Sequence, residues 1–242
     1  MKRFFLIFFV LIQLFACNKI QSCFDTNGKT GSRKVLLDSF NTLSVNNLFN
    51  IELLDSSEYS ISIMTKEKNI KNIGYKIENG ELMVNNLKNC QWLVKSEYPT
   101  IVVSSPNLKQ INIYNPCKIT SSNNLKYKAL NIQTFSEMLD IDISLDCDSL
   151  HLVLTGAGVY KFKGNANFTY LYTTNSGYFM GEDFETKKMH LVHKSLGTDI
   201  FSVTEKLYVE YIDYANVFLL SCPVIEVKED YKKWIVRQSN CE

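Results

Sequence analysis

Short apolar segments return at a nearly constant spacing along the second half of the chain, and this periodicity constrains the fold more than any other feature. They recur at steps of 19, 20, 19, 20, 18 and 18 residues and are centred on Ile113, Ile132, Leu152, Leu171, Leu191, Val209 and Val227. A second apolar cluster follows each of the first six segments. This spacing predicts a stack of similar structural units, because one unit of this size cannot bury its apolar face alone.

Each unit is predicted to be one rung of a parallel β-solenoid. The segments alternate apolar and polar residues with a period of two, which is typical of half-buried strands. No helical period follows any of them, which argues against a leucine-rich repeat. We therefore predict an all-β fold with rungs of about 19 residues over residues 108–228, in which the inward side chains stack into an apolar column.

The segments on either side of this region are predicted to cover the open ends of the stack. Residues 34–107 also alternate with period two, and Asn79 and Gly80 separate two apparent strands, which is a strong hairpin signal. We expect an N-terminal β-rich region that caps one end and a charged C-terminal cap or tail over residues 229–242.

The N-terminus has the layout of a secretory signal. Two cations, Lys2 and Arg3, precede an apolar run that predicts a signal peptide over residues 1–16. The four residues that end at Cys17 resemble the lipobox of bacterial lipoproteins, in which the cysteine is lipidated and becomes the new N-terminus. Residues 17–33 continue as a polar tether. We expect a cell-envelope protein, anchored to the outer membrane by lipid, and the sequence leaves open which side of that membrane it faces.

Cysteine spacing and net charge limit the chemistry further. Six cysteines follow Cys17 and permit 15 disulfide connectivities that the sequence cannot rank: Cys23, Cys90, Cys117, Cys147, Cys222 and Cys241. They form no Cys-x-x-Cys pair, so we predict no metal site and no cofactor. The 26 basic and 25 acidic residues nearly balance, which gives no electrostatic basis for binding nucleic acid.

A glycine-rich segment, Thr155-Gly156-Ala157-Gly158, is the one candidate for a nucleotide-binding loop. A dinucleotide fingerprint would need a third glycine at position 161, which is Lys161, and a helix after the loop. The residues that follow alternate like a strand instead. We interpret the segment as a corner of a rung and predict no catalytic residues.

The order of motifs over residues 34–228 resembles the head GIN domain family of auto-transporter adhesins, which are envelope proteins found mainly in Bacteroidetes. The matching features are a first strand led by Phe40, the hairpin ENGELMV, and a strand that ends at Pro106 and is followed by Leu108 and Ile111. The resemblance implies a right-handed β-helix with glycine corners, of which residues 155–158 are the best match. It also implies an adhesin with no catalytic role.

Aromatic and imidazole side chains at outward positions of successive rungs form the candidate binding surface. The residues are Tyr114, His151, Tyr170, Tyr172, His190 and Tyr208. At a rung spacing of about 4.8 Å they would form a ridged patch for a glycan or for an envelope or host protein. Cross-strand pairs that only stabilise the sheet would give the same pattern. Two further functions stay open, a periplasm-facing structural lipoprotein and a carbohydrate-active β-helix enzyme.

Overall fold

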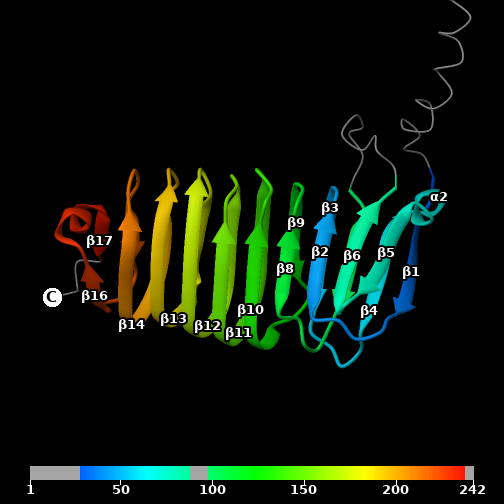
Figure 1. Ribbon diagram of the computed structural model, residues 1–242, viewed down its shortest axis with the longest axis horizontal. Coiled ribbons are helices and arrows are strands. Elements are labelled where there is room, and N and C mark those ends of the chain that lie inside the picture. Colours follow the sequence, from blue (N-terminus) through cyan, green and yellow to red (C-terminus); the bar gives the residue numbers. More distant parts are fainter. Residues whose placement is uncertain (1–27, 88–97, 238–242) are drawn as a thin grey trace, which may run out of the picture.

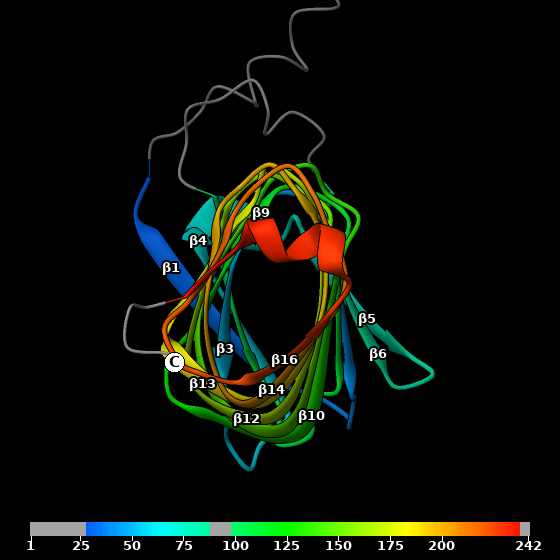
Figure 2. The ribbon, with the colours of Figure 1, turned by 90° about the vertical axis from the view of Figure 1, so that its left-hand side faces the viewer.

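The computed structural model describes residues 28–87 and 98–237 and has the predicted architecture, a solenoid of stacked parallel strands (Figure 1). Viewed along its axis, the coil is flattened into two long sides (Figure 2). Partner residues on adjacent rungs lie about 20 positions apart, as Leu152 and Leu171 do, and Leu171 and Leu191. The all-β prediction with rungs of about 19 residues is therefore confirmed.

The two sides are called here the first face and the second face. The short strands of the first face, in spatial order, are β5 (Ile73–Glu78), β6 (Glu81–Asn86), β2 (Thr42–Asn46), β8 (Gln110–Ile113) and β10 (Leu125–Thr134). Those of the second face are β1 (Thr30–Leu36), β4 (Ser60–Lys66), β7 (Thr100–Ser104), β3 (Phe49–Leu54) and β9 (Cys117–Ser121).

Four long strands then each run from the second face onto the first. They are β11 (Leu139–Leu154), β12 (Val159–Asn175), β13 (Tyr178–Ser195) and β14 (Asp199–Ile212). The start of β11 pairs with β9 and its remainder pairs with β10, so the strand itself bends around one edge of the solenoid. We call this the bend edge. The chain returns from the first face to the second through short turns, which form the opposite turn edge.

An apolar column fills the space behind the first face, as the periodicity predicts. Its members are all buried and are Leu82, Leu43, Ile111, Ile132, Leu152, Leu171, Leu191 and Val209. The structure differs from the expected column at its first position, because Ile111 and not Ile113 pairs with Ile132. Ile111 and Ile113 both point inward from β8, so the alternation of apolar and polar residues cannot show which of them pairs with Ile132.

Parallel stacking extends past the expected boundary at residues 107 and 108 into the N-terminal region. There β2 lies between β6 and β8, and β3 lies between β7 and β9, so the order of rungs along the axis differs from their order in the chain. Antiparallel strands β4, β1 and β5 follow at the outer end. The predicted hairpin joins β5 to β6, and positive φ angles of 52° at Asn79 and 78° at Gly80 give its tight turn.

The C-terminal end is formed by β15 (Val217–Leu219), β16 (Val224–Val227) and β17 (Ile235–Arg237). A short 3-10 helix, η2 (Glu229–Trp234), lies across this end in Figure 2. Its Tyr231 packs edge-on against Tyr211 of β14, with ring centroids 5.4 Å apart. The expected C-terminal cap thus includes a helical turn and a short strand up to the last described residue.

The glycine-rich segment is a corner at the turn edge, as interpreted from the sequence. A side chain at Gly158 would place its Cβ 1.9 Å from the carbonyl oxygen of Leu139 on the preceding rung, and Gly158 has a φ of 150°. Gly158 is followed directly by strand β12. Because no helix begins there, the loop lacks the helix N-terminus that holds the pyrophosphate in a dinucleotide-binding fold.

Three of the seven cysteines lie among the described residues. Cys117 and Cys147 are free thiols, and burial raises the pKa of each to about 12. Cys222 is disulfide-bonded. The expected pairing therefore does not include Cys117 or Cys147. Cys23, Cys90 and Cys241 lie outside the described residues, as does the lipidation candidate Cys17.

Candidate functional site

The parallel register brings four of the predicted binding residues into one row on the outer side of the first face. His151 lies opposite Tyr170, Tyr170 opposite His190, and His190 opposite Tyr208. The four residues come from β11, β12, β13 and β14 and are all at least partly exposed. We call this the aromatic row.

The rings of the row contact one another along its whole length. His151 and Tyr170 stack almost in parallel, with centroids 4.4 Å apart and planes 7° apart. Tyr170 meets His190 edge-on at 5.1 Å, and His190 meets Tyr208 edge-on at 4.7 Å. Aromatic pairs favour both arrangements. The contacts hold the side chains as a continuous surface across four strands.

Hydrogen bonds fix both imidazoles. His151 Nδ1 lies 3.2 Å from Asn131 Oδ1 on the preceding rung. His190 Nε2 lies 2.7 Å from the Glu210 carboxylate on the following rung, and the carboxylate accepts this hydrogen bond. The residues that orient the rings are thus supplied by neighbouring rungs, so the geometry of the row depends on the solenoid register.

Stacking decides which part of each ring a ligand can reach. Since His151 and Tyr170 cover one face of each other, their edges carry the remaining polar atoms. Burial raises the pKa of the Tyr170 phenol and lowers the pKa of His151, which keeps both groups neutral near pH 7. This part of the row therefore offers neutral hydrogen-bond donors and acceptors.

A second outward row lies beside the first and contains Tyr172. This side chain lies between Val153 and Val192, and Tyr211 follows Val192 in the same row. The Lys194 ammonium lies 5.5 Å from the ring centroid of Tyr172 and 5.3 Å from that of Tyr211. These are cation-π distances, so the lysine bridges the two tyrosines.

Two residues of this surface are absent from the sequence-based set. Phe168 is exposed two positions before Tyr170 on the same strand, and this spacing could have identified it. Tyr211 could not be found in this way, because a register shift after Leu191 pairs Val192 with Tyr211, whereas an unshifted register would pair it with Glu210. With them, the aromatic face comprises His151, Phe168, Tyr170, Tyr172, His190, Tyr208 and Tyr211.

Tyr114 is the predicted binding residue that the structure places elsewhere. It lies at the turn edge, directly after β8, and stacks on Phe135 with centroids 4.9 Å and planes 6° apart. The pair is an exposed aromatic contact of its own and is not continuous with the aromatic row.

His193 points inward, as the alternation from His190 predicts, and forms a buried polar pair with Asp199. Its Nε2 atom lies 3.2 Å from the Asp199 carboxylate, which also accepts a hydrogen bond of 2.7 Å from the backbone N–H of Phe179. Both side chains are fully buried, and burial raises the pKa of Asp199. A ligand on the surface cannot reach this pair.

In the part of the chain that the structure describes, no group of three or more histidine, cysteine, aspartate or glutamate residues could hold a metal ion. None of the helices in this part is long and apolar enough to cross a membrane.

A family model described as "Putative auto-transporter adhesin, head GIN domain" matches residues 39–223. The chain belongs to the head GIN domain family. The resemblance inferred from the strand motifs is therefore confirmed. Comparison with curated protein sequences finds no match.

Several solved structures share the fold at low sequence identity. A putative adhesin from Bacteroides fragilis NCTC 9343 has a TM-score of 0.74 and 18% identity, over 88% of this chain and 94% of that one. A putative adhesin from Parabacteroides merdae ATCC 43184 has a TM-score of 0.60 and 18% identity, over 88% and 95%.

A third solved structure carries a different description. A putative lipid binding protein from Parabacteroides distasonis ATCC 8503 has a TM-score of 0.56 and 14% identity, over 89% of this chain and 97% of that one. At these identities the likenesses show the fold alone. The family description names adhesion, a function of cell-surface proteins, and names no enzymatic activity.

Proposed function

We propose that this head GIN domain protein is a non-catalytic binding module of the cell envelope that engages its partner through the aromatic face. The observation that carries the proposal is the aromatic row, in which four rings on four successive strands contact one another and stay accessible. A row of this kind presents exposed aromatic surface on rigidly held side chains, which is a common property of recognition sites.

The partner favoured by this surface is an extended glycan that lies along the solenoid axis. Strands of a sheet are about 4.8 Å apart, so the row repeats polar ring edges at regular intervals. The neutral phenol of Tyr170 and the neutral imidazole of His151 suit hydrogen bonds to hydroxyl groups. Exposed rings such as Phe168 add apolar contact. A protein of the envelope or of a host is the alternative partner.

We further propose that the mature protein is attached to the outer membrane by lipid on Cys17. The lipobox-like residues before Cys17 and the apolar run before them support this attachment. Protease treatment of intact cells tests whether the protein is exposed. Cleavage only after lysis would exclude adhesion to external surfaces and favour a periplasm-facing structural lipoprotein.

The binding proposal is tested by replacing two rings of β12. Tyr170→Ala with Tyr172→Ala removes the centre of the aromatic face, and Tyr178→Ala with Phe218→Ala removes two exposed rings elsewhere as the matched control. Both double variants and the unaltered protein would be screened against purified envelope polysaccharides and envelope proteins. We expect loss of binding in the first variant alone. Unchanged binding in that variant would remove the aromatic face from consideration.

A further inference from the structure

Exposed apolar side chains gather at the turn edge of the solenoid. Among the described residues, seven large apolar or tyrosine side chains that are exposed to solvent lie in these turns: Leu87, Tyr98, Tyr114, Phe135, Met138, Leu196 and Tyr214. Backbone hydrogen bonds join consecutive turns, from Phe135 N–H to Ile113 and from Leu196 N–H to Asn175. The seven side chains therefore follow one edge of the molecule, and we call them the apolar edge.

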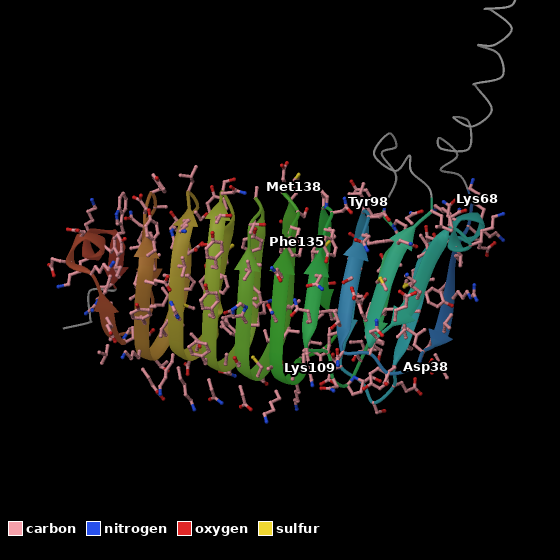
Figure 3. All side chains as sticks on the ribbon, viewed as in Figure 1. Asp38, Lys68, Tyr98, Lys109, Phe135 and Met138 are labelled. Atoms are coloured by element: carbon pink, nitrogen blue, oxygen red, sulfur yellow. The ribbon has the colours of Figure 1, made fainter. Side chains whose placement is uncertain are left out.

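The opposite edge is mainly polar, with Leu36 and Val224 as its exposed apolar side chains. Where β10, β11 and β12 bend, Asn124 and Asn165 donate hydrogen bonds of 2.5 and 3.0 Å to the Asp146 carboxylate. These bonds lower the pKa of Asp146, which stays charged. Figure 3 shows Lys109 and Asp38 on this side of the molecule and Tyr98 and Met138 on the other. The solenoid is thus amphipathic from edge to edge, in addition to having two different faces.

The folded chain begins on the apolar side. The Glu67 N–H of α2 (Glu67–Ile70) donates a hydrogen bond of 3.1 Å to the carbonyl oxygen of Lys29, directly before β1. In Figure 1, α2 lies on the side of the turns, and Lys68 has the same position in Figure 3. Residues 17–27 precede the first described residue, and at roughly 3.5 Å per residue they can span about 40 Å at most.

We propose that the apolar edge rests on the surface of the lipid bilayer to which Cys17 is anchored. The solenoid axis would then run parallel to the membrane, with the polar bend edge facing away. Phenylalanine, leucine and methionine side chains would enter the boundary between headgroups and acyl chains, and the three tyrosines would lie at headgroup level. Residues 17–27 favour a lipid bilayer as the partner of the apolar edge, because they join the folded chain on the same side as that edge.

Charge at the chain entry is compatible with the same surface. The segment from Lys66 to Lys71 carries three lysines and one glutamate, so it is cationic and suits anionic headgroups. In this orientation the aromatic face is roughly perpendicular to the membrane surface, where a glycan or protein can reach it. The proposed membrane contact rests on the proposed function only in assuming a lipid on Cys17, because the apolar edge is present whether or not Cys17 is lipidated.

Vesicle flotation with non-acylated protein tests the contact. The chain from residue 18 onward, which contains every described strand, would be mixed with vesicles of phosphatidylethanolamine and phosphatidylglycerol. The edge variant combines Phe135→Ser, Met138→Ser and Leu196→Ser, whose side chains are 54%, 63% and 65% exposed. The matched control combines Leu36→Ser, Phe218→Ser and Val224→Ser, which are exposed away from the turn edge. Circular dichroism would verify that both variants remain folded.

We expect the unaltered protein and the control to float with the vesicles and the edge variant to bind at least tenfold more weakly, since binding scales with the apolar area that enters the interface. Absence of vesicle binding by the unaltered protein, or equal weakening by both variants, would overturn the proposal. Sedimentation would detect a dimer that only the edge variant disrupts, and that result would assign the edge to a second copy of the chain instead. Labelling of Cys17 with radioactive palmitate in cells tests the anchor separately, so failure of one proposal leaves the other measurable.

Discussion

Leu171 provides a direct test of the stacked core. It is fully buried and lies between Leu152 and Leu191 in the apolar column. Leu171→Ala removes three carbon atoms from a site closed on both sides by neighbouring rungs, so the cavity can collapse only partly. We expect a loss of about 3 kcal/mol in the free energy of unfolding, within the range of roughly 2 to 5 kcal/mol for such substitutions. For a chain of this size that corresponds to a melting temperature lower by about 6 to 12 °C.

Tyr172→Ala is the matched control on the same strand. Tyr172 points outward, and its removal loses the contact with the Lys194 ammonium, which contributes on the order of 1 kcal/mol or less. Thermal and urea unfolding followed by circular dichroism would measure both variants. Because a shift of one residue in strand register exchanges inward and outward positions, equal losses or a larger loss in Tyr172→Ala would refute the assignment of faces.

Three further predictions concern a corner glycine, a buried carboxyl group and two free thiols. Gly158→Val should lower stability by several kcal/mol, because its Cβ would lie 1.9 Å from the Leu139 carbonyl oxygen; an unchanged melting temperature would contradict the corner geometry. Burial raises the pKa of Asp199, so this carboxyl group stabilises the fold most below its unfolded pKa and loses that contribution as pH rises through its folded pKa. Asp199→Asn should therefore flatten the dependence of the melting temperature on pH in this range. Identical profiles for the variant and the unaltered protein would contradict the raised pKa. Cys117 and Cys147, with pKa values of about 12, should react with iodoacetamide much more slowly in the folded than in the unfolded protein, and equal rates in the two states would contradict this placement.

The sequence could predict what depends on local alternation and repeat length. Repeats of about 19 residues fixed the stacking of Leu152, Leu171 and Leu191, and the same register placed His151, Tyr170 and His190 in one row. The Asn79-Gly80 pair between two alternating segments also identified the hairpin. In each case the positions of side chains follow from strand geometry alone.

Features that depend on distant partners could not be predicted in this way. The placement of β6 and β7 beyond β2 and β3 requires pairing between segments about 40 to 50 residues apart in the chain. The register shift that brings Tyr211 opposite Val192 interrupts the alternation from which the row was extended. The apolar edge was missed because turn residues do not alternate inward and outward as strand residues do, so only the structure reveals that Phe135 and Leu196 are exposed on one side.

Modification of tyrosines in living cells tests the central claim most directly. Purified protein and intact cells would be treated with N-acetylimidazole, and acetylation would be quantified by mass spectrometry. If the aromatic face binds an envelope partner, Tyr170 and Tyr208 should be modified several-fold more slowly in cells than in the purified protein, while the partly exposed Tyr59, directly before β4, should react equally in both. Equal modification of Tyr170 and Tyr208 in cells and in purified protein would contradict the account.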